Sequence, residues 1–243
     1  MKIVDLAKSS AKCIIVLVLL LCETLSAQNN PYVDDKLFHV GFSLGVNMMA
    51  YGVKESNLTL NGEQYHVRQR GVMPGFTVGF IGDVRLARYL NLRFIPGLSF
   101  ASRTLSYQTE SGNPVQGSVG SGSTVEILAI PIQLPVQLKF SAQREKNYRP
   151  YVVVGGGASY NVFPDRKKPV AQKGWDAFVE AGFGCDLYFS WFKLCPEIKY
   201  QIGFMNQLMP IDGRIEVAPE DRFYSESIGR LTNHTISIVF NFE

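Results

Sequence analysis

The amino-acid sequence predicts an all-β protein: an eight-stranded antiparallel up-and-down transmembrane β-barrel. Three observations support this fold. Long segments alternate between apolar and small or polar residues, short connections alternate with long ones, and no apolar run approaches the length of a membrane-spanning helix. An alternation with a period of two is typical of strands, because successive side chains point to opposite faces of a sheet.

The clearest alternation lies in residues 126–140, EILAIPIQLPVQLKF. The even positions from Leu128 to Phe140 are all apolar, whereas the odd positions include two glutamines and Lys139. A transmembrane strand needs roughly 9–11 residues, so this segment is long enough to cross a bilayer. Pro131 and Pro135 lack N–H groups toward the same neighbouring strand, so we expect irregular pairing there.

Seven other segments share this alternation, and together with residues 126–140 they predict eight strands. Their apolar positions are, in chain order, Phe38, Val40, Phe42, Leu44, Val46 and Met48 in 37–51; Phe76, Val78, Phe80 and Val84 in 74–86; Leu92, Phe94, Leu98 and Phe100 in 90–107; Val152, Val154, Ala158, Tyr160 and Val162 in 151–163; Ala177, Val179, Ala181, Phe183 and Leu187 in 175–189; Leu194, Ile198, Tyr200 and Ile202 in 192–204; and Ile236, Ile238, Phe240 and Phe242 in 230–242.

The connections between these segments indicate the topology. Short links (87–89, 141–150 and 190–191) alternate with long polar loops (52–73, 108–123, 164–174 and 205–229). Bacterial outer-membrane barrels combine short periplasmic turns with long outer loops in this way. An open sheet edge in lipid would leave backbone groups unpaired, so we expect a closed sheet with both termini in the periplasm.

The face opposite the apolar one carries charges of both signs. A soluble lipocalin-type barrel, the main alternative, would place its apolar face inside around a ligand. Large aromatic residues such as Phe94 and Phe183 suit a lipid-facing surface instead, and mixed charges suit a narrow lumen in which they pair. We therefore expect a charge network in the lumen, made of Asp83, Arg85, Arg93, Arg103, Lys139, Asp176, Glu180, Asp186, Lys193, Glu197 and Lys199.

The N-terminus resembles an export signal. Three lysines precede the apolar run 14–21, and Ala27 offers a cleavage site. The expected division is a signal peptide at 1–27, a short periplasmic segment at 28–36 and the barrel at 37–243. A lipoprotein signal at Cys22 is the alternative, although Leu21 before it is bulky. Of the mature cysteines, Cys185 and Cys195 could pair or could be small strand residues on opposite faces.

Other features argue against several function classes. A formal charge of +3 suggests no nucleic-acid partner. His39, His66 and His234 are the three histidines, and they form no recognisable catalytic triad, so we expect no enzyme. A rim enzyme using one of them is the alternative. We find no candidate catalytic, cofactor-binding or metal-binding residue, and no small-molecule substrate.

Two charged connections are candidate contact regions. The third outer loop is basic, with Arg166, Lys167, Lys168 and Lys173, and could meet lipopolysaccharide phosphates. We expect outer-membrane lipid and lipopolysaccharide as partners. The turn 141–149 is the longest on its side and could contact a periplasmic protein, although a simple exposed turn is the alternative. Its candidate contact residues are Arg144, Glu145, Lys146 and Arg149.

Several stretches resemble the PorT/SprT family of small outer-membrane barrels. They are YVDDKLFHVGFSLGVN at 32–47, PGF at 74–76, NLRFIPGLSF at 91–100, PIQLPVQLKF at 131–140 and NYRPY at 147–151. The resemblance implies a component of the type IX protein secretion and gliding machinery that supports cargo export through contacts with secretion-system proteins. It implies no catalytic residues. A general small barrel acting as an anchor or adhesin, like OmpX, is the alternative.

Overall fold

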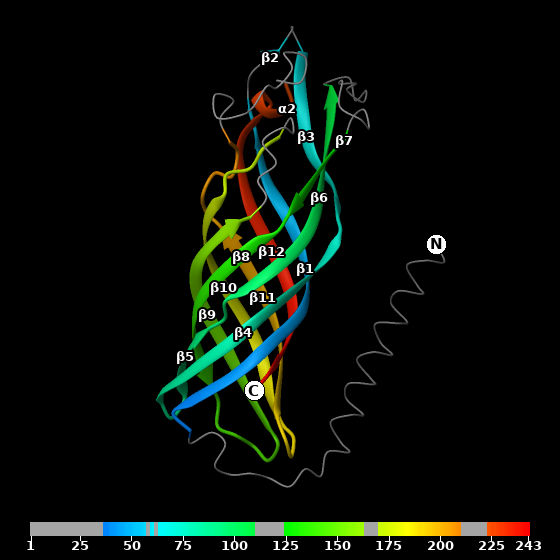
Figure 1. Ribbon diagram of the computed structural model, residues 1–243. Coiled ribbons are helices and arrows are strands. Elements are labelled where there is room, and N and C mark those ends of the chain that lie inside the picture. Colours follow the sequence, from blue (N-terminus) through cyan, green and yellow to red (C-terminus); the bar gives the residue numbers. More distant parts are fainter. Residues whose placement is uncertain (1–35, 57–58, 61–62, 110–123, 163–169, 210–222) are drawn as a thin grey trace, which may run out of the picture.

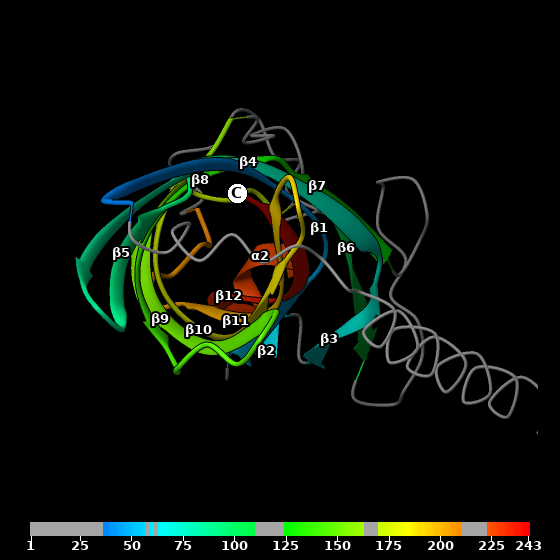
Figure 2. The same ribbon diagram turned by 90° about the horizontal axis from the view of Figure 1, so that it is seen from below.

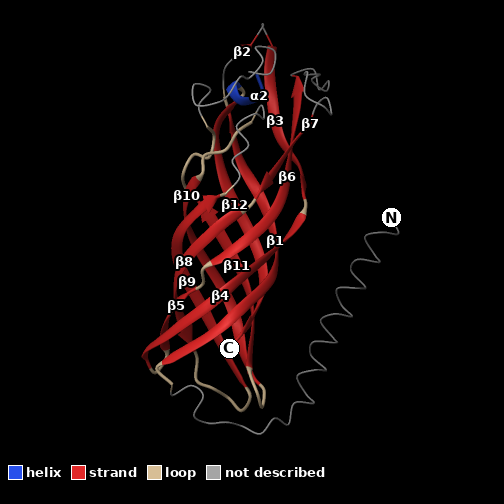
Figure 3. Cartoon of the chain, in the orientation of Figure 1, coloured by secondary structure: helices blue, strands red, loops and turns tan. Residues whose placement is uncertain are grey.

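The computed structural model describes residues 36–56, 59–60, 63–109, 124–162, 170–209 and 223–243. The signal-peptide prediction and the first three basic residues of the third loop lie outside them. Tilted strands form the wall of a tall barrel, with one short helix near one end (Figures 1 and 3). The elements are β1 (Phe38–Glu55), β2 (Thr59–Leu60), β3 (Glu63–Val72), β4 (Pro74–Ala87), β5 (Leu90–Phe94), β6 (Gly97–Thr109), β7 (Thr124–Ala129), β8 (Pro131–Ser141), β9 (Tyr148–Asn161), β10 (Trp175–Tyr188), β11 (Lys193–Gly203), α2 (Phe223–Glu226) and β12 (Ile228–Phe242).

The strands close into a ring, seen along its axis in Figure 2. Each neighbouring pair is antiparallel, and β1 closes the ring by pairing with both β12 and β4. At Phe42 the partners on the two sides are Phe242 and Phe80. If β3 is counted with β4, β5 with β6 and β7 with β8 as single interrupted strands, and the two-residue β2 is left aside, the described strands number eight, one for each predicted segment. The predicted fold is therefore confirmed.

The irregular pairing predicted at the prolines is confirmed on one side of β8. The register of β8 with β9 runs without a break from Pro131 to Ser141. On the other side the ladder is interrupted between β5 and β6, at Ile95 and Pro96. The Ile95 amide donates to the Pro135 carbonyl at 3.3 Å, and the return bond is missing because proline has no N–H. Prolines therefore account for the interruptions that divide the third and fourth predicted strands.

The apolar face points outward, which excludes the lipocalin-type arrangement. Phe80 is 75% exposed, Phe183 59% and Val154 50%, although all three lie within long strands. The even positions of β8 that are named above as apolar, from Ile132 to Phe140, are also exposed. Within the described residues no helix is both long and apolar enough to cross a membrane.

The loop predicted at 52–73 is wrong over most of its described length. β1 continues to Glu55, and β3 fills residues 63–72 and pairs with β6. Together with β7, these strands extend past the rest of the ring at the end that carries the long connections (Figure 1). We call this part the outer extension, made of residues 51–55, 65–72, 101–109 and 124–129.

In the outer extension the apolar side chains lie on the inward face and the polar ones on the outward face, the reverse of the arrangement in the rest of the barrel. Val67, Leu105 and Tyr107 point inward and are buried, whereas Thr104 and Ser106 point outward. Below it, on the same strand, Leu98 is exposed and Ser99 is buried. An outward surface that changes from apolar to polar matches the change from lipid to water along the barrel. The inversion therefore marks the edge of the lipid-facing belt.

A charged substitution should cost stability according to its position relative to this edge. We expect Val154→Arg, near the middle of β9, to lower the free energy of unfolding by ~2–4 kcal/mol, because arginine at the bilayer midplane faces lipid. Thr104→Arg, beyond the edge, should cost about 0–1 kcal/mol. Urea unfolding in lipid vesicles measures both. Equal losses would contradict the assigned edge.

Candidate functional site

The lumen gathers nearly all the charged residues predicted to face it. Ten of the eleven are buried, and Arg85 is half-buried near the short-turn end. Those ten are Asp83, Arg93, Arg103, Lys139, Asp176, Glu180, Asp186, Lys193, Glu197 and Lys199. They reach the interior because each occupies the position opposite the lipid-facing residues of its strand.

Arg93 on β5 is the centre of the charge network in the lower lumen, the part nearer the short-turn end. Its Nε lies 3.3 Å from Asp83 Oδ2, its Nη1 3.1 Å from Glu197 Oε2 and its Nη2 2.9 Å from Glu243 Oε1. The guanidinium can serve three carboxylates at once because its donors form a rigid planar fork. These contacts join β4, β5 and β11 to the residue that follows β12.

A second ion pair lies beside this centre. Lys139 Nζ is 2.7 Å from Asp186 Oδ1, and it also lies 4.1 Å from the centre of the Tyr151 ring. The Tyr151 hydroxyl donates to Glu197 Oε2 at 2.8 Å, which links the two groups. Lys193 pairs with Glu243. The lower lumen is thus one connected network of alternating charges, as a water-poor interior requires.

The remaining charges of the upper lumen take amide partners. Arg103 Nη1 donates to Asn233 Oδ1 at 2.5 Å, and Asn233 donates in turn to Asp176 Oδ2 at 2.6 Å. Glu180 accepts a 2.6 Å hydrogen bond from Gln137. The predicted network therefore holds ion pairs in its lower part and charge-to-amide hydrogen bonds in its upper part.

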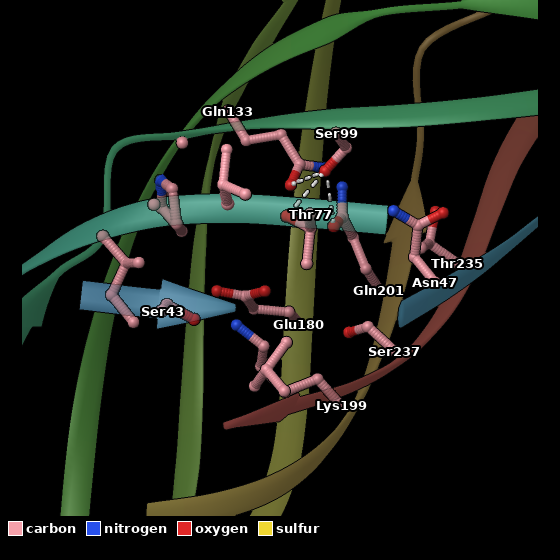
Figure 4. A pocket seen from close by; sticks show the side chains of 16 residues that line it. Ser43, Asn47, Thr77, Ser99, Gln133, Glu180, Lys199, Gln201, Thr235 and Ser237 are labelled. Carbon is pink, nitrogen blue, oxygen red and sulfur yellow. Dashed lines mark hydrogen bonds between the residues drawn. The ribbon is translucent and has the colours of Figure 1, made fainter. Parts of the chain in front are cut away.

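Polar side chains leave little free space between the lower and upper parts of this network. Figure 4 shows a cavity in which Ser99 Oγ lies within hydrogen-bond distance of Thr77 Oγ1, at 3.0 Å, and of Gln133 Oε1, at 3.1 Å. Its volume is about 30 Å³, and a neighbouring cavity that reaches Asp176 has about 20 Å³. Spaces of this size hold one or two water molecules. Neither cavity admits an extended polypeptide.

The glycines of β9 help to make room for the polar layer. Gly155 and Gly157 face inward, and a β-carbon at Gly155 would press on Gln137. The space beside them is used by Gln137 and Glu180, both buried. The absence of side chains at these two positions therefore leaves room for bulky lumen neighbours.

An apolar cluster closes the lumen at the long-loop end. It packs inward-facing residues of the outer extension against Tyr224 of α2, which lies over the ring in Figure 2. The Tyr107 hydroxyl donates to the Tyr224 carbonyl at 2.9 Å, and the two rings meet edge to face. The cluster contains Tyr51, Val67, Leu105, Tyr107, Val125, Ile127, Val170, Tyr224, Ile228 and Leu231.

The turn after β8 presents only part of the predicted contact set. Lys146 and Glu145 are exposed, and Arg144 lies over the Tyr188 ring at 3.7 Å. Arg149 instead is buried, and its guanidinium donates to the carbonyls of Ala142 and Arg88 at 2.8 and 2.9 Å. Arg149 thus braces the turn from inside, which corrects its expected place on a contact surface.

The cysteines and histidines lie apart from one another. Cys185 faces outward, Cys195 is fully buried in the lumen, and no disulfide joins them, so the opposite-face alternative is the one observed. His39 lies at the short-turn end. His66 pairs with Glu55 at 3.0 Å in the outer extension, and His234 contacts the Tyr200 hydroxyl at 2.9 Å on the outward face.

Sequence reasoning missed three members of the lumen network: Glu243 and Tyr151 in its lower part and Gln137 in its upper part. Each sits at an inward position of its strand or just after it, so periodicity alone could have placed Gln137 and Tyr151 in the lumen. Their roles could not be found in this way, because the Tyr151–Glu197 and Gln137–Glu180 contacts join strands that are distant in the sequence.

Comparison with known proteins decides the family. Residues 26–208 match the family described as "Outer membrane protein beta-barrel domain". The chain belongs to this family. It is therefore an integral barrel of the outer membrane, with the outward apolar belt in contact with lipid. No curated protein matches the sequence.

Two solved barrels are similar in structure. Neisserial surface protein A has 8% sequence identity and a TM-score of 0.44, over 85% of this chain and 96% of that one. Ail, the attachment invasion locus protein of Yersinia pestis, solved with the heparin analogue sucrose octasulfate, has 11% identity and a TM-score of 0.34, over 84% of this chain and 96% of that one.

The Lys139–Asp186 pair makes a testable contribution to the barrel. We expect Lys139→Met to lower the free energy of unfolding by about 3–5 kcal/mol, because Asp186 would remain buried without its cation. Adding Asp186→Asn should restore much of the loss. Urea unfolding of the refolded barrel measures both variants, and a double variant as unstable as the single one would show that the two residues do not couple.

Proposed function

We propose that this outer-membrane barrel is a component of the type IX protein secretion machinery and supports cargo export through contacts with other secretion proteins. The observation that carries the proposal is the placement of the PorT/SprT-like stretches. In the described residues they fall on β1, β4, β5 with β6, β8 and β9. These strands are consecutive neighbours in the ring, so the stretches occupy one continuous arc of the wall.

The filled lumen supports a contact role over a conducting one. Arg93 and its three carboxylate partners cross the lower lumen, and the cavities above them hold about 30 and 20 Å³. Cargo would therefore pass through another protein. The proposal includes no catalysis, no small-molecule substrate and no nucleic acid. Its partners are secretion-system proteins and the surrounding lipid.

Deleting the gene should leave cargo proteins in the periplasm. Cell fractionation followed by immunoblotting of a secreted cargo measures this. Normal cargo secretion in the deletion strain would overturn the proposal.

Complementation then locates the contact surface. Two double variants are compared in the deletion strain. The arc variant carries Phe80→Ala and Phe94→Ala, on the arc of the wall that bears the PorT/SprT-like stretches. The matched control carries Val179→Ala and Ile198→Ala, on the opposite wall. All four side chains are exposed on the outward face. The arc variant should fail to restore secretion and the control should restore it, with both barrels present in the outer membrane at normal levels. Full restoration by the arc variant would remove the arc from the proposed contact.

The proposal also orients the barrel, with the short-turn end in the periplasm and the outer extension at the cell surface. β1 begins and β12 ends at the short-turn end, beside the turns after β4, β8 and β10 (Figure 1). Long connections are the extracellular ones in outer-membrane barrels.

Cysteine labelling tests this orientation. Gln108→Cys in the outer extension should react with a membrane-impermeant maleimide in intact cells. Gln143→Cys, in the turn after β8, should react only after the outer membrane is permeabilised. Both positions are exposed, and both replace the same residue type. The opposite labelling pattern would invert the barrel.

A surface anchor or adhesin is the second candidate function, favoured by the outer extension. Its strands carry a buried apolar cluster of their own, so it would present a firm surface outside the membrane. This function leaves cargo secretion intact in the deletion strain. It predicts altered surface binding when residues 52–73 or 205–229 are trimmed.

A further inference from the structure

Three basic side chains stand side by side on the outward surface just beyond the lipid-facing belt. They are Arg68 on β3, Lys54 on β1 and Arg230 on β12, and all three are exposed. We call them the basic row. On β1 the row follows the outward positions Met48, Ala50 and Gly52, so it lies just past the point where large apolar side chains end on this strand.

The strand register fixes the row. Lys54 is the direct antiparallel partner of Arg230. β3 runs along the other side of β1, where the Glu55 carboxylate accepts from the Val67 amide at 3.0 Å. The Tyr51 amide also donates to Gln69 Oε1 at 2.6 Å, so residue 68 lies along the segment of β1 between Tyr51 and Glu55. Val67 is buried, so its neighbour Arg68 projects outward there.

This arrangement is unfavourable for the protein alone. Like charges directly opposite each other on neighbouring strands are destabilising. Arg230 Nη2 donates to the Phe204 carbonyl at 2.6 Å, which leaves the charge of Arg230 without an acidic partner. No salt bridge joins any of the three to an acidic side chain in the part of the chain that the structure describes. The nearby carboxylate of Glu55 is held by His66 and by the Val67 amide. An anion outside the protein would satisfy the row.

The surface just below the row is suited to the junction of a lipid headgroup with its chains. Tyr200, His234 and Thr232 form a hydrogen-bonded line on the outward face, with distances of 2.9 Å and 3.4 Å. The line continues to the Gly52 carbonyl, which accepts from Thr232 at 3.2 Å. Below it the outward surface is apolar, with Met48 and Ile236 about half exposed.

We propose that the basic row binds the phosphate groups of lipopolysaccharide in the outer leaflet. The acyl chains lie against the apolar belt, the polar line meets the sugar backbone, and the phosphates lie between Arg68, Lys54 and Arg230. Lipopolysaccharide fits this site because it places several fixed phosphates at the level where the belt ends. The proposal rests on the orientation given under "Proposed function", with the outer extension at the cell surface.

The test uses the purified full-length mature barrel in non-ionic detergent, titrated with diphosphoryl lipid A. The variant Lys54→Gln, Arg68→Gln, Arg230→Gln removes the row. The matched control Lys36→Gln, Arg88→Gln, Lys146→Gln removes three exposed charges at the short-turn end. One cation near an anionic lipid surface contributes roughly a fivefold gain in affinity, so the row variant should bind about 100-fold more weakly. The control variant should bind as the unaltered barrel does.

A second variant separates binding from folding. Arg230→Glu places a carboxylate opposite Lys54, which relieves the like-charge repulsion while weakening the anion site. It should keep the thermal stability of the lipid-free barrel and still lose affinity for diphosphoryl lipid A. Dephosphorylated lipid A should bind the unaltered barrel no better than it binds the row variant.

Several outcomes would overturn the proposal. They are unchanged affinity in the row variant, equal losses in the row and control variants, and equal affinity of the unaltered barrel for phosphatidylglycerol, which would show a general response to anionic headgroups. These measurements use isolated protein, so they fail or succeed independently of cargo secretion in cells. A barrel that binds lipid A but labels in the inverted orientation would contradict the cellular setting and leave the chemistry of the site intact.

Discussion

The structure depends on one constraint: in lipid, every backbone N–H and C=O must find a partner within the protein. The ring meets it by pairing β1 with both β12 and β4. Once the sheet closes, the side chains divide strictly between an outward and an inward face. Residues that face inward are removed from both lipid and bulk water, so their charges need partners of their own, and the Arg93 and Lys139 networks supply them.

The same constraint explains where the barrel is irregular. Pro135 cannot return the hydrogen bond of Ile95, and the third and fourth strands are each interrupted in this part of the wall. An uninterrupted ladder of β8 with β9 compensates on the opposite side. The motif-bearing arc is therefore also the part of the wall in which the third and fourth strands are interrupted.

Much of the fold followed from the sequence because alternation is a local signal. The alternation with their immediate neighbours predicts that Phe80, Phe183 and Val154 point outward. The closed ring follows from the need to pair every strand edge. The sequence prediction fails for β3 and for the end of β1, which it assigns to a loop, because the alternation changes sign in the outer extension. Val67 is apolar on the face that is polar lower down, so β3 does not continue the pattern that identifies the other strands. The partners of Arg93 were beyond sequence reasoning, since Asp83, Glu197 and Glu243 meet only after the ring has closed.

Arg93 also limits how far the barrel can deform. Its side chain connects the wall that contains β4 and β5 to the wall that contains β11 and the residue after β12. Pulling the two walls apart would strip one cation from three carboxylates in a dry interior, which makes sideways opening of the lower barrel very costly. The lower barrel is built as a rigid post. In the proposed secretion role, such a rigid barrel would keep its shape while the movement that passes cargo takes place in other proteins of the machinery.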